Sequence, residues 1–325
     1  MATRRHTSVF ISGLLILALL TFFDLFRGSW TSAGIQNGFH VILTTLRVPR
    51  VLTAIIAGGG LALAGAQMQS ILRNPLADPH IMGISSGASL GAAIALLAGG
   101  GTAVGGFISG LSVTLSAVIG AGAASAIIIS ASRRFSGTAT LLVFGVMLGF
   151  IVNASVTILQ AGSNAESLKV FHSWSAGSFS TTSGRDIYVI AAALACSAAL
   201  AFINRKGLDI ILFGDEFTLS SGVRPEKVRL TALLSCCLVT GAITAFCGPI
   251  GFVGIVAPHI ARATCRTSAH RAVLPASFLF GAVTGVIADI ISQTAGRGIP
   301  VSSAMAIVGI PVIIYILFKK SGHIL

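Results

Sequence analysis

Few residues in this sequence could do chemistry, and several of those few lie inside long apolar stretches. Asn153 and Gln160 are seven residues apart, so a helix would place both amides on nearly the same face. There they could line a weakly polar pathway or pack between helices, and the residues alone do not decide. His259 and Asp289 also lie in apolar runs, where ionisable groups are costly and often functional. They could relay protons, cap helices or hydrogen-bond between helices.

The sequence patterns of common catalytic sites are missing. It contains no H-E-x-x-H and no close pair of carboxylates within one apolar segment, so we expect no catalytic residue. It also contains no Gly-Lys dipeptide, which excludes the phosphate loop G-x-x-x-x-G-K-[ST]. Any energy from ATP must therefore come from a partner, and we expect no cofactor in this chain.

The five cysteines lie within or at the edge of apolar runs and have no C-x-x-C spacing. A disulfide framework or zinc site would need regular spacing in polar loops. We therefore predict that all five are small buried hydrophobic residues and that the chain has no metal site. They are Cys196, Cys236, Cys237, Cys247 and Cys265.

The composition excludes a water-soluble enzyme. Of the 325 residues 54% are apolar and only 9% are charged, and the mean hydropathy is +0.93, whereas soluble domains carry about 25% charge. A helix needs about 20 apolar residues to cross a bilayer, and about ten such runs occur, so we predict an all-α polytopic membrane protein that forms one transmembrane domain over residues 1–325. The runs are 8–27, 51–72, 81–100, 107–130, 139–161, 186–203, 228–248, 250–264, 273–294 and 299–318.

The net charge of +12 reads as a topology signal and not as a sign of nucleic-acid binding. With ten spans and the N-terminus inside, fifteen of the 21 Lys and Arg residues fall on the inner side and six on the outer side. Because basic residues collect on the cytoplasmic side of membrane proteins, we expect both termini to be cytoplasmic.

The longest inner connection, about residues 204–227, is rich in charge and is a candidate docking surface. Within it, residues 215–223 could form a short helix, since acidic residues favour a helix N-terminus and Gly222 suits a helix stop. A solvated loop is the alternative.

Two segments, 65–88 and 241–260, share a loose pattern of small residues followed by Pro and a Gly-rich apolar stretch. Five predicted crossings separate them, which would place them in opposite orientation, as in an inverted repeat.

Several motifs in order resemble the FecCD/BtuC-like permeases, the membrane subunits of type II ABC importers for iron-siderophores, haem and vitamin B12. The resemblance extends from about residue 45 to the C-terminus. Its motifs are Arg47-Val-Pro-Arg50, Gly65-Ala-Gln-Met-Gln-Ser, Asn74-Pro-Leu-Ala-Asp-Pro79, Gly83-Ile-Ser-Ser-Gly87, the segment from Gly248 through Pro258-His259 to Arg262, Ala288-Asp289, Gly298-Ile-Pro300 and Gly309-Ile-Pro311.

The resemblance implies a BtuC-like permease fold of ten helices, a homodimer, and a translocation path at the subunit interface. It also implies two ABC ATPase subunits on the cytoplasmic side, which bind the ATP and Mg. These would engage a coupling helix made of Gly214, Asp215, Glu216, Ser220, Gly222 and Val223. Such a helix converts closure of the ATPase dimer into movement of the spans.

On the outer side, the resemblance implies a periplasmic or lipid-anchored substrate-binding protein whose Glu residues meet Arg47, Arg50 and Arg297. Guanidinium groups suit bidentate contact with carboxylates, and the charge count places these three outside. Snorkelling at the membrane interface is the alternative.

The resemblance also implies a narrow cytoplasmic gate at Gly137, Thr138 and Ala139, where Ala139 replaces a Ser of some relatives. It places His172 on a short external helix, where this side chain could contact a haem or an iron chelate or be only a surface residue. For His259 and Asp289 it favours structural hydrogen bonds over a proton relay.

We therefore predict the permease of an ABC importer in the bacterial cytoplasmic membrane, surrounded by lipid, with an iron(III)-siderophore as cargo. Haem and cobalamin are alternatives that the motifs do not separate. The rivals are an ion-coupled secondary transporter, which should have buried carboxylates or ion sites in broken helices, and a purely structural membrane subunit.

Overall fold

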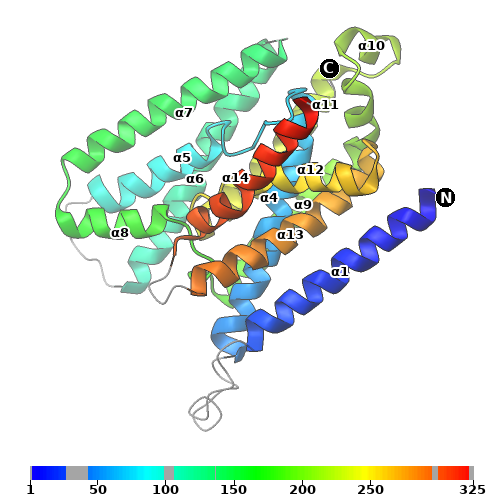
Figure 1. Cartoon of the computed structure of the whole chain (residues 1–325). Helices are drawn as coiled ribbons and strands as arrows, with labels where there is room; N and C mark the ends of the chain where they lie inside the picture. The colour runs from blue at the N-terminus through cyan, green and yellow to red at the C-terminus, as the bar shows by residue number, and fades with distance from the viewer. Residues whose placement is uncertain (1, 27–42, 99–105, 136, 295–298, 322–325) are drawn as a thin grey trace.

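A computed structural model describes residues 2–26, 43–98, 106–135, 137–294 and 299–321. Within these ranges the chain forms twelve α-helices and two short π-helical turns, and no strand is present. Most of the long helices lie side by side in a bundle (Figure 1). The sequence prediction of an all-α protein is confirmed.

The helices have the following bounds in chain order. They are α1 (Ala2–Phe26), the π-helical turn η1 (Leu43–Arg47), α4 (Val48–Ile71), α5 (Ile84–Ala93), the π-helical turn η2 (Ile94–Ala98), α6 (Gly106–Arg134), α7 (Thr138–Ala161), α8 (Ala165–Ser175), α9 (Gly184–Ile211), α10 (Asp215–Ser220), α11 (Pro225–Cys247), α12 (Val253–Cys265), α13 (His270–Thr294) and α14 (Val301–Ser321).

Each of the ten predicted spans corresponds to one helix, and α8 and α10 are the two additional short helices. Within the described ranges, seven helices are long and apolar enough to cross a membrane. The apolar helices at Ile84–Leu97 and Val301–Tyr315 are shorter, and α12 has only 13 residues. The fold therefore agrees with the prediction, whereas ten complete crossings stay a prediction.

Helix α4 forms the centre of the bundle and packs against α9, α11, α12 and α13. In its most apolar window 83% of the residues are buried, compared with 11% in α1 and 17% in α9. A side chain at Gly58 would place its Cβ 2.3 Å from the carbonyl oxygen of Gly281. Since only glycine leaves room for this approach, the small residues of α4 let its backbone touch that of α13.

The outer surface of the bundle is apolar on several helices. Leu19 of α1, Ile158 of α7 and Ile203 of α9 are each more than two-thirds exposed. Such surfaces suit a hydrocarbon environment.

Four cysteines are buried, but Cys196 is exposed on α9. The prediction that all five are buried was therefore wrong for Cys196. In a membrane protein an apolar side chain can face lipid as well as the protein core.

The two ends of the bundle carry different elements (Figure 1). The α10 end also carries the start of α1 and the end of α14, and the α8 end carries α8 and the end of α1. Helices α4 and α11 run in opposite directions between them, because the end of α4 and the start of α11 both meet α10.

The two loosely similar segments pack against each other. Gln69 donates from Nε2 to the carbonyl oxygen of Gly254 at 3.2 Å, and the hydroxyls of Ser85 and Thr244 are 3.1 Å apart. Each segment is the end of a long buried helix, a turn and the start of a shorter helix. Their opposite directions are those expected from an inverted repeat, and the repeat itself stays a prediction.

Candidate functional site

The short helix α10 has the start and stop that its sequence predicts. Gly214 precedes it with φ of +105°, and Gly222 follows it with φ of +77°, a conformation that favours glycine. The N–H of Val223 donates to the carbonyl of Thr218, and that of Gly222 to the carbonyl of Leu219. These two bonds are the Schellman closure of a helix C-terminus, and they hold the loop after α10 in a compact turn.

Asp215 anchors α10 to the bundle. Both of its carboxylate oxygens accept a hydrogen bond from Nη2 of Arg229 at 2.7 Å, and Nη2 of Arg73 lies 3.7 Å away. The Arg229 side chain is only 5% exposed. Because Arg73 follows α4 and Arg229 belongs to α11, these contacts connect α10 directly to two of the best-buried helices.

The outward surface of α10 and its preceding turn is acidic and aromatic. Glu216 is exposed, and Phe213, Phe217 and Leu219 are 74%, 50% and 59% exposed. The rings of Phe213 and Phe217 lie 5.3 Å apart. Sequence reasoning missed these three apolar residues, although apolar side chains within a charged loop are themselves a sign of a contact surface. Ser220 is exposed beside them.

At the α8 end, Arg50 lies at the base of a polar network. Its Nε donates to both carboxylate oxygens of Asp289, at 2.7 and 3.0 Å, and the Asp289 side chain is fully buried. Gln293 donates from Nε2 to Asp289 and to Asp24, each at 2.9 Å. Asp289 thus makes interhelical hydrogen bonds, as the resemblance implied, and the network joins α1, α4 and α13. The sequence reasoning missed Asp24.

Arg50 also lines an open cavity of about 740 Å³ at this end, together with Lys169 and His172 of α8. The cavity continues to Gln293 and to Ile299 and Pro300 before α14. Among the described residues no carboxylate lines it, and Arg50 and Lys169 place two cationic side chains on its wall. The structure thus brings together two residues to which the sequence gave separate roles, Arg50 and His172.

Arg47, another predicted docking arginine, is not among the described residues that line this cavity. Arg47 ends the turn η1 and donates from Nη1 to the carbonyl oxygen of Leu25 at 2.7 Å. Arg297 lies outside the described residues.

The predicted gate turn lies at the α10 end. Gly137 precedes the first turn of α7 in an extended conformation, Thr138 is half-buried and Ala139 is exposed. The end of α6, just before this turn, lines a cavity of about 630 Å³ together with Asp215 and Leu219 of α10. The predicted gate turn therefore lies close to α10.

The predicted pathway residues on α7 lie beside its buried face. That face consists of Leu141, Gly145, Gly149, Val152 and Val156. Asn153 is exposed and Gln160 is half-buried, and neither lines the cavity that contains His172. His259 has Nδ1 2.8 Å from the carbonyl oxygen of Ile255 within its own helix.

The sequence matches the FecCD transport family over residues 7–319. It is 32% identical to the hemin transport system permease HmuU of Yersinia pestis, over 91% of this chain and 88% of the relative. It is also 32% identical to the vitamin B12 import system permease BtuC of Klebsiella pneumoniae, over 91% of this chain and 87% of the relative.

A solved structure described as an inward-facing metal-chelate type ABC transporter has a similar fold. The TM-score is 0.86 at 26% identity, and the match covers 96% of this chain and 99% of the other.

Proposed function

The chain belongs to the FecCD transport family and is a permease of an ABC importer, and from this premise we propose that its cargo is an iron(III)-siderophore or a related metal chelate. The permease has no catalytic activity of its own. The proposal includes a homodimer in the cytoplasmic membrane with both termini inside, two ABC ATPase subunits that bind ATP and Mg at the α10 end, and a substrate-binding protein at the α8 end.

The geometry of α10 is the observation that carries the proposed docking of the ATPase subunits. Its outward surface presents Phe213, Phe217 and Leu219, whereas Asp215 links it to α4 and α11. A soluble partner can bury the exposed aromatic rings, which are the side chains that dominate protein interfaces. The charge link then passes movement of the partner to the spans. Gly214, Ser220, Gly222 and Val223 shape this surface rather than anchor it.

Purified ATPase subunits provide the test of this docking surface. The Phe217→Ser variant should weaken their binding by about tenfold or more, since a desolvated aromatic anchor is typically worth at least 2 kcal/mol. Phe202→Ser is the control, because Phe202 is an exposed phenylalanine of α9 outside this surface. Equal affinities of the two variants would argue against α10 as the docking surface.

The basic cavity at the α8 end supports the proposed docking of a binding protein. Arg50, Lys169 and His172 line it without a carboxylate, so acidic side chains on a protein partner would find complementary charge there. The proposed docking site also includes Arg47, which ends the turn η1, and Arg297, which lies outside the described residues.

The open face of α7 supports the homodimer. Asn153 is exposed although it lies in the middle of a membrane-length helix. An amide facing hydrocarbon is unfavourable, whereas an amide facing protein or a water-filled path is not. We therefore place the second copy and the pathway on the side of α7 that carries Asn153 and Gln160, with Gly137, Thr138 and Ala139 as its inner gate.

The cargo class rests on the relatives, which include a hemin and a vitamin B12 permease and a metal-chelate type transporter. Haem and cobalamin are therefore the alternative cargoes. Uptake by the reconstituted complex should be measured with labelled ferric siderophores, haem and cobalamin. Saturable uptake of a ferric siderophore that the other two do not compete for would support the proposal, and uptake of haem or cobalamin alone would replace it.

A further inference from the structure

Three cavities follow one another along α6. The first, of about 630 Å³, lies between the end of α6, α10 and the start of α11. The second, of about 470 Å³, shares Arg134 and Phe135 with the first. The third, of about 360 Å³, shares Ile127 with the second. Because consecutive cavities share wall residues, they lie next to one another along α6. This row of cavities, here called the α6 groove, begins at the α10 end and extends toward the middle of α6.

The α10 end of the groove is basic. Arg133 and Arg134 of α6 and Arg224 before α11 line its first cavity and are exposed. Among the residues that the structure describes, none of these three guanidinium groups makes an ion pair. They are therefore available to an anion that enters from the membrane surface or the solvent.

Two carboxylates also line the first cavity, Asp215 and Glu226. Asp215 already accepts two hydrogen bonds from Arg229, so its charge is compensated within the protein. Glu226 is exposed in the first turn of α11. After the pair of Asp215 and Arg229 is set aside, three arginines face one carboxylate, and the first cavity keeps a positive excess.

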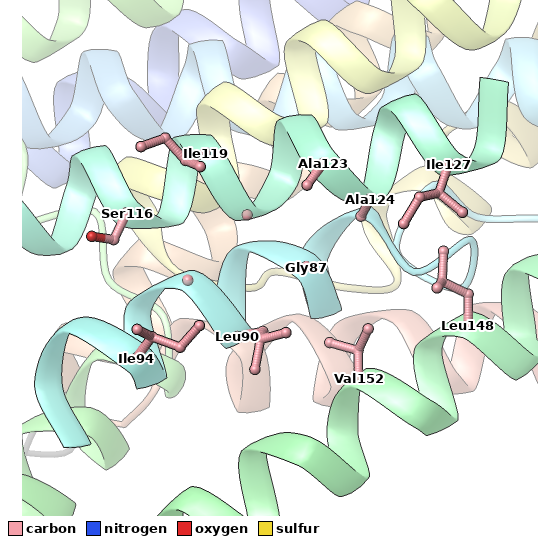
Figure 2. A pocket seen from close by; sticks show the side chains of 12 residues that line it. Gly87, Leu90, Ile94, Ser116, Ile119, Ala123, Ala124, Ile127, Leu148 and Val152 are labelled. Carbon is pink, nitrogen blue, oxygen red and sulfur yellow. The ribbon is translucent and has the colours of Figure 1, made fainter. Parts of the chain in front are cut away.

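The rest of the groove is apolar. Phe135 and Phe144 line the second cavity, with ring centroids 5.6 Å apart. Figure 2 shows the third cavity between α5, α6 and α7, where Ser116 provides the only polar side chain among the described lining residues. Its other large side chains include Leu90, Ile94, Ile127, Leu148 and Val152.

A groove that is cationic at the membrane surface and apolar along its length matches an amphiphile with an anionic head. Helix α6 rises 1.5 Å per residue, so the lined stretch from Arg134 to Ser116 measures about 27 Å. One leaflet of the hydrocarbon core is about 15 Å thick, so an acyl chain fits within this length. Basic pockets between membrane helices are typical sites for anionic lipid head groups.

We propose that the α6 groove binds one anionic phospholipid. Its phosphate lies between Arg133, Arg134 and Arg224, and one acyl chain follows the apolar walls past Phe135 and Ile127. The inference depends on the membrane setting and on this groove, and it is independent of the cargo. Leu219 lines both the first cavity and the proposed ATPase surface, so the test uses the permease without its ATPase.

The experiment is native mass spectrometry of the purified full-length protein titrated with phosphatidylglycerol and with phosphatidylcholine of the same acyl chains. The wild type should bind phosphatidylglycerol several-fold more tightly. The R133Q/R134Q variant should lose this preference, with a drop in phosphatidylglycerol affinity of about thirtyfold, since each of the two basic residues near the head group contributes about 1 kcal/mol. The control K206Q/R271Q also removes two exposed basic residues, but outside the groove, and should keep the preference.

A second variant tests the acyl half of the site. Ala126 lines the second cavity with an exposed methyl group, so Ala126→Phe should fill the groove and reduce binding of both lipids. Ala195→Phe, at an exposed alanine of α9, is the control. Equal binding of the two lipids to the wild type, or an R133Q/R134Q effect no larger than that of K206Q/R271Q, would overturn the proposal. If glycerol 3-phosphate competes fully while Ala126→Phe still binds phosphatidylglycerol normally, the site is an anion site and not a lipid site.

Discussion

The carboxylate of Asp215 accepts a hydrogen bond on each oxygen from Nη2 of Arg229, and this pair fixes the exposed helix α10 to the buried start of α11. Glu216, the next residue, is exposed. Two neighbouring acids in one predicted coupling helix therefore have different environments. Asp215 acts as an internal anchor, and Glu216 belongs to the outward surface.

Replacing these two acids one at a time should separate anchoring from docking. Asp215→Asn leaves the buried Arg229 without its counter-charge. Because Asp215 is about one-third exposed, we expect a loss of about 1–2 kcal/mol rather than the 3–5 kcal/mol of a fully buried pair. Glu216→Gln should leave the melting temperature unchanged and reduce the ATPase stimulation by substrate-loaded binding protein.

Thermal unfolding of the purified permease and stimulated ATPase activity of the complex are the two measurements. If Glu216→Gln lowers the melting temperature as much as Asp215→Asn does, the two residues share one structural role and the distinction is wrong.

The cationic cavity at the α8 end predicts that mutations can separate binding-protein affinity from protein stability. Lys169 is exposed, lines the cavity and makes no ion pair among the described residues, so Lys169→Gln should raise the Kd of the binding protein several-fold without changing stability. Arg50→Gln should do both, because it leaves the buried carboxylate of Asp289 without its cation. Arg185→Gln, at an exposed cation of α9 outside the cavity, is the control. The Kd is measured by calorimetric titration. Equal Kd values of the binding protein for Lys169→Gln and Arg185→Gln would contradict docking at this cavity.

The open face of α7 can be tested by thiol labelling in a cysteine-free background. Asn153 and Ile151 are both exposed, but two residues along a helix place them on nearly opposite sides. If Asn153 faces a water-filled path, Asn153→Cys should react with a charged thiol reagent at least about tenfold faster than Ile151→Cys, because thiolates do not form in hydrocarbon. Equal slow rates would place both residues in lipid.

Asp78 predicts a pH dependence of stability. It lies in the turn between α4 and α5, is 4% exposed, and accepts a hydrogen bond from the backbone N–H of His80 at 2.7 Å. Burial raises the pKa of Asp78 above its ordinary value, and the nearby His80 lowers it by less. The folded state therefore binds the proton more tightly than the unfolded state, so this residue's contribution to stability falls as pH rises from the ordinary carboxyl pKa through the folded value.

Asp78→Asn keeps the acceptor for His80 and removes the buried charge. The stability of this variant should not fall in this way as pH rises. At neutral pH it should unfold at a temperature equal to or above that of the wild type. Unfolding curves from pH 4 to 8 provide the comparison, with Asp186→Asn as the control for a carboxylate at a helix start. A wild type and an Asp78→Asn variant with parallel curves would show that Asp78 carries no such linkage.

The helices of this protein could be predicted from its sequence because the bilayer dictates them. An apolar run of about 20 residues has few alternatives to a helix in hydrocarbon, and all ten runs became helices. The end of α10 could also be predicted, because Gly222 adopts the positive φ that the predicted helix end requires.

Contacts between distant residues could not be predicted in the same way. Arg50 and Asp289 are 239 residues apart, and nothing local selects one partner over another. Arg50 was assigned to docking and Asp289 to structure, yet the two form one ion pair. The exposed side of each helix also could not be predicted from the sequence, because lipid and the protein core both accept apolar residues. For this reason the exposure of Cys196 was not predicted.

The central claim is that this permease performs no work of its own and is driven by ATPases that bind at α10. The most direct measurement is uptake of a labelled ferric siderophore by proteoliposomes that contain the permease, its ATPase and its binding protein, with ATP and ion gradients varied separately. The account predicts uptake that requires ATP, persists when all ion gradients are collapsed, and is lost in the Phe217→Ser variant. Uptake that continues without ATP while an ion gradient is present would contradict it.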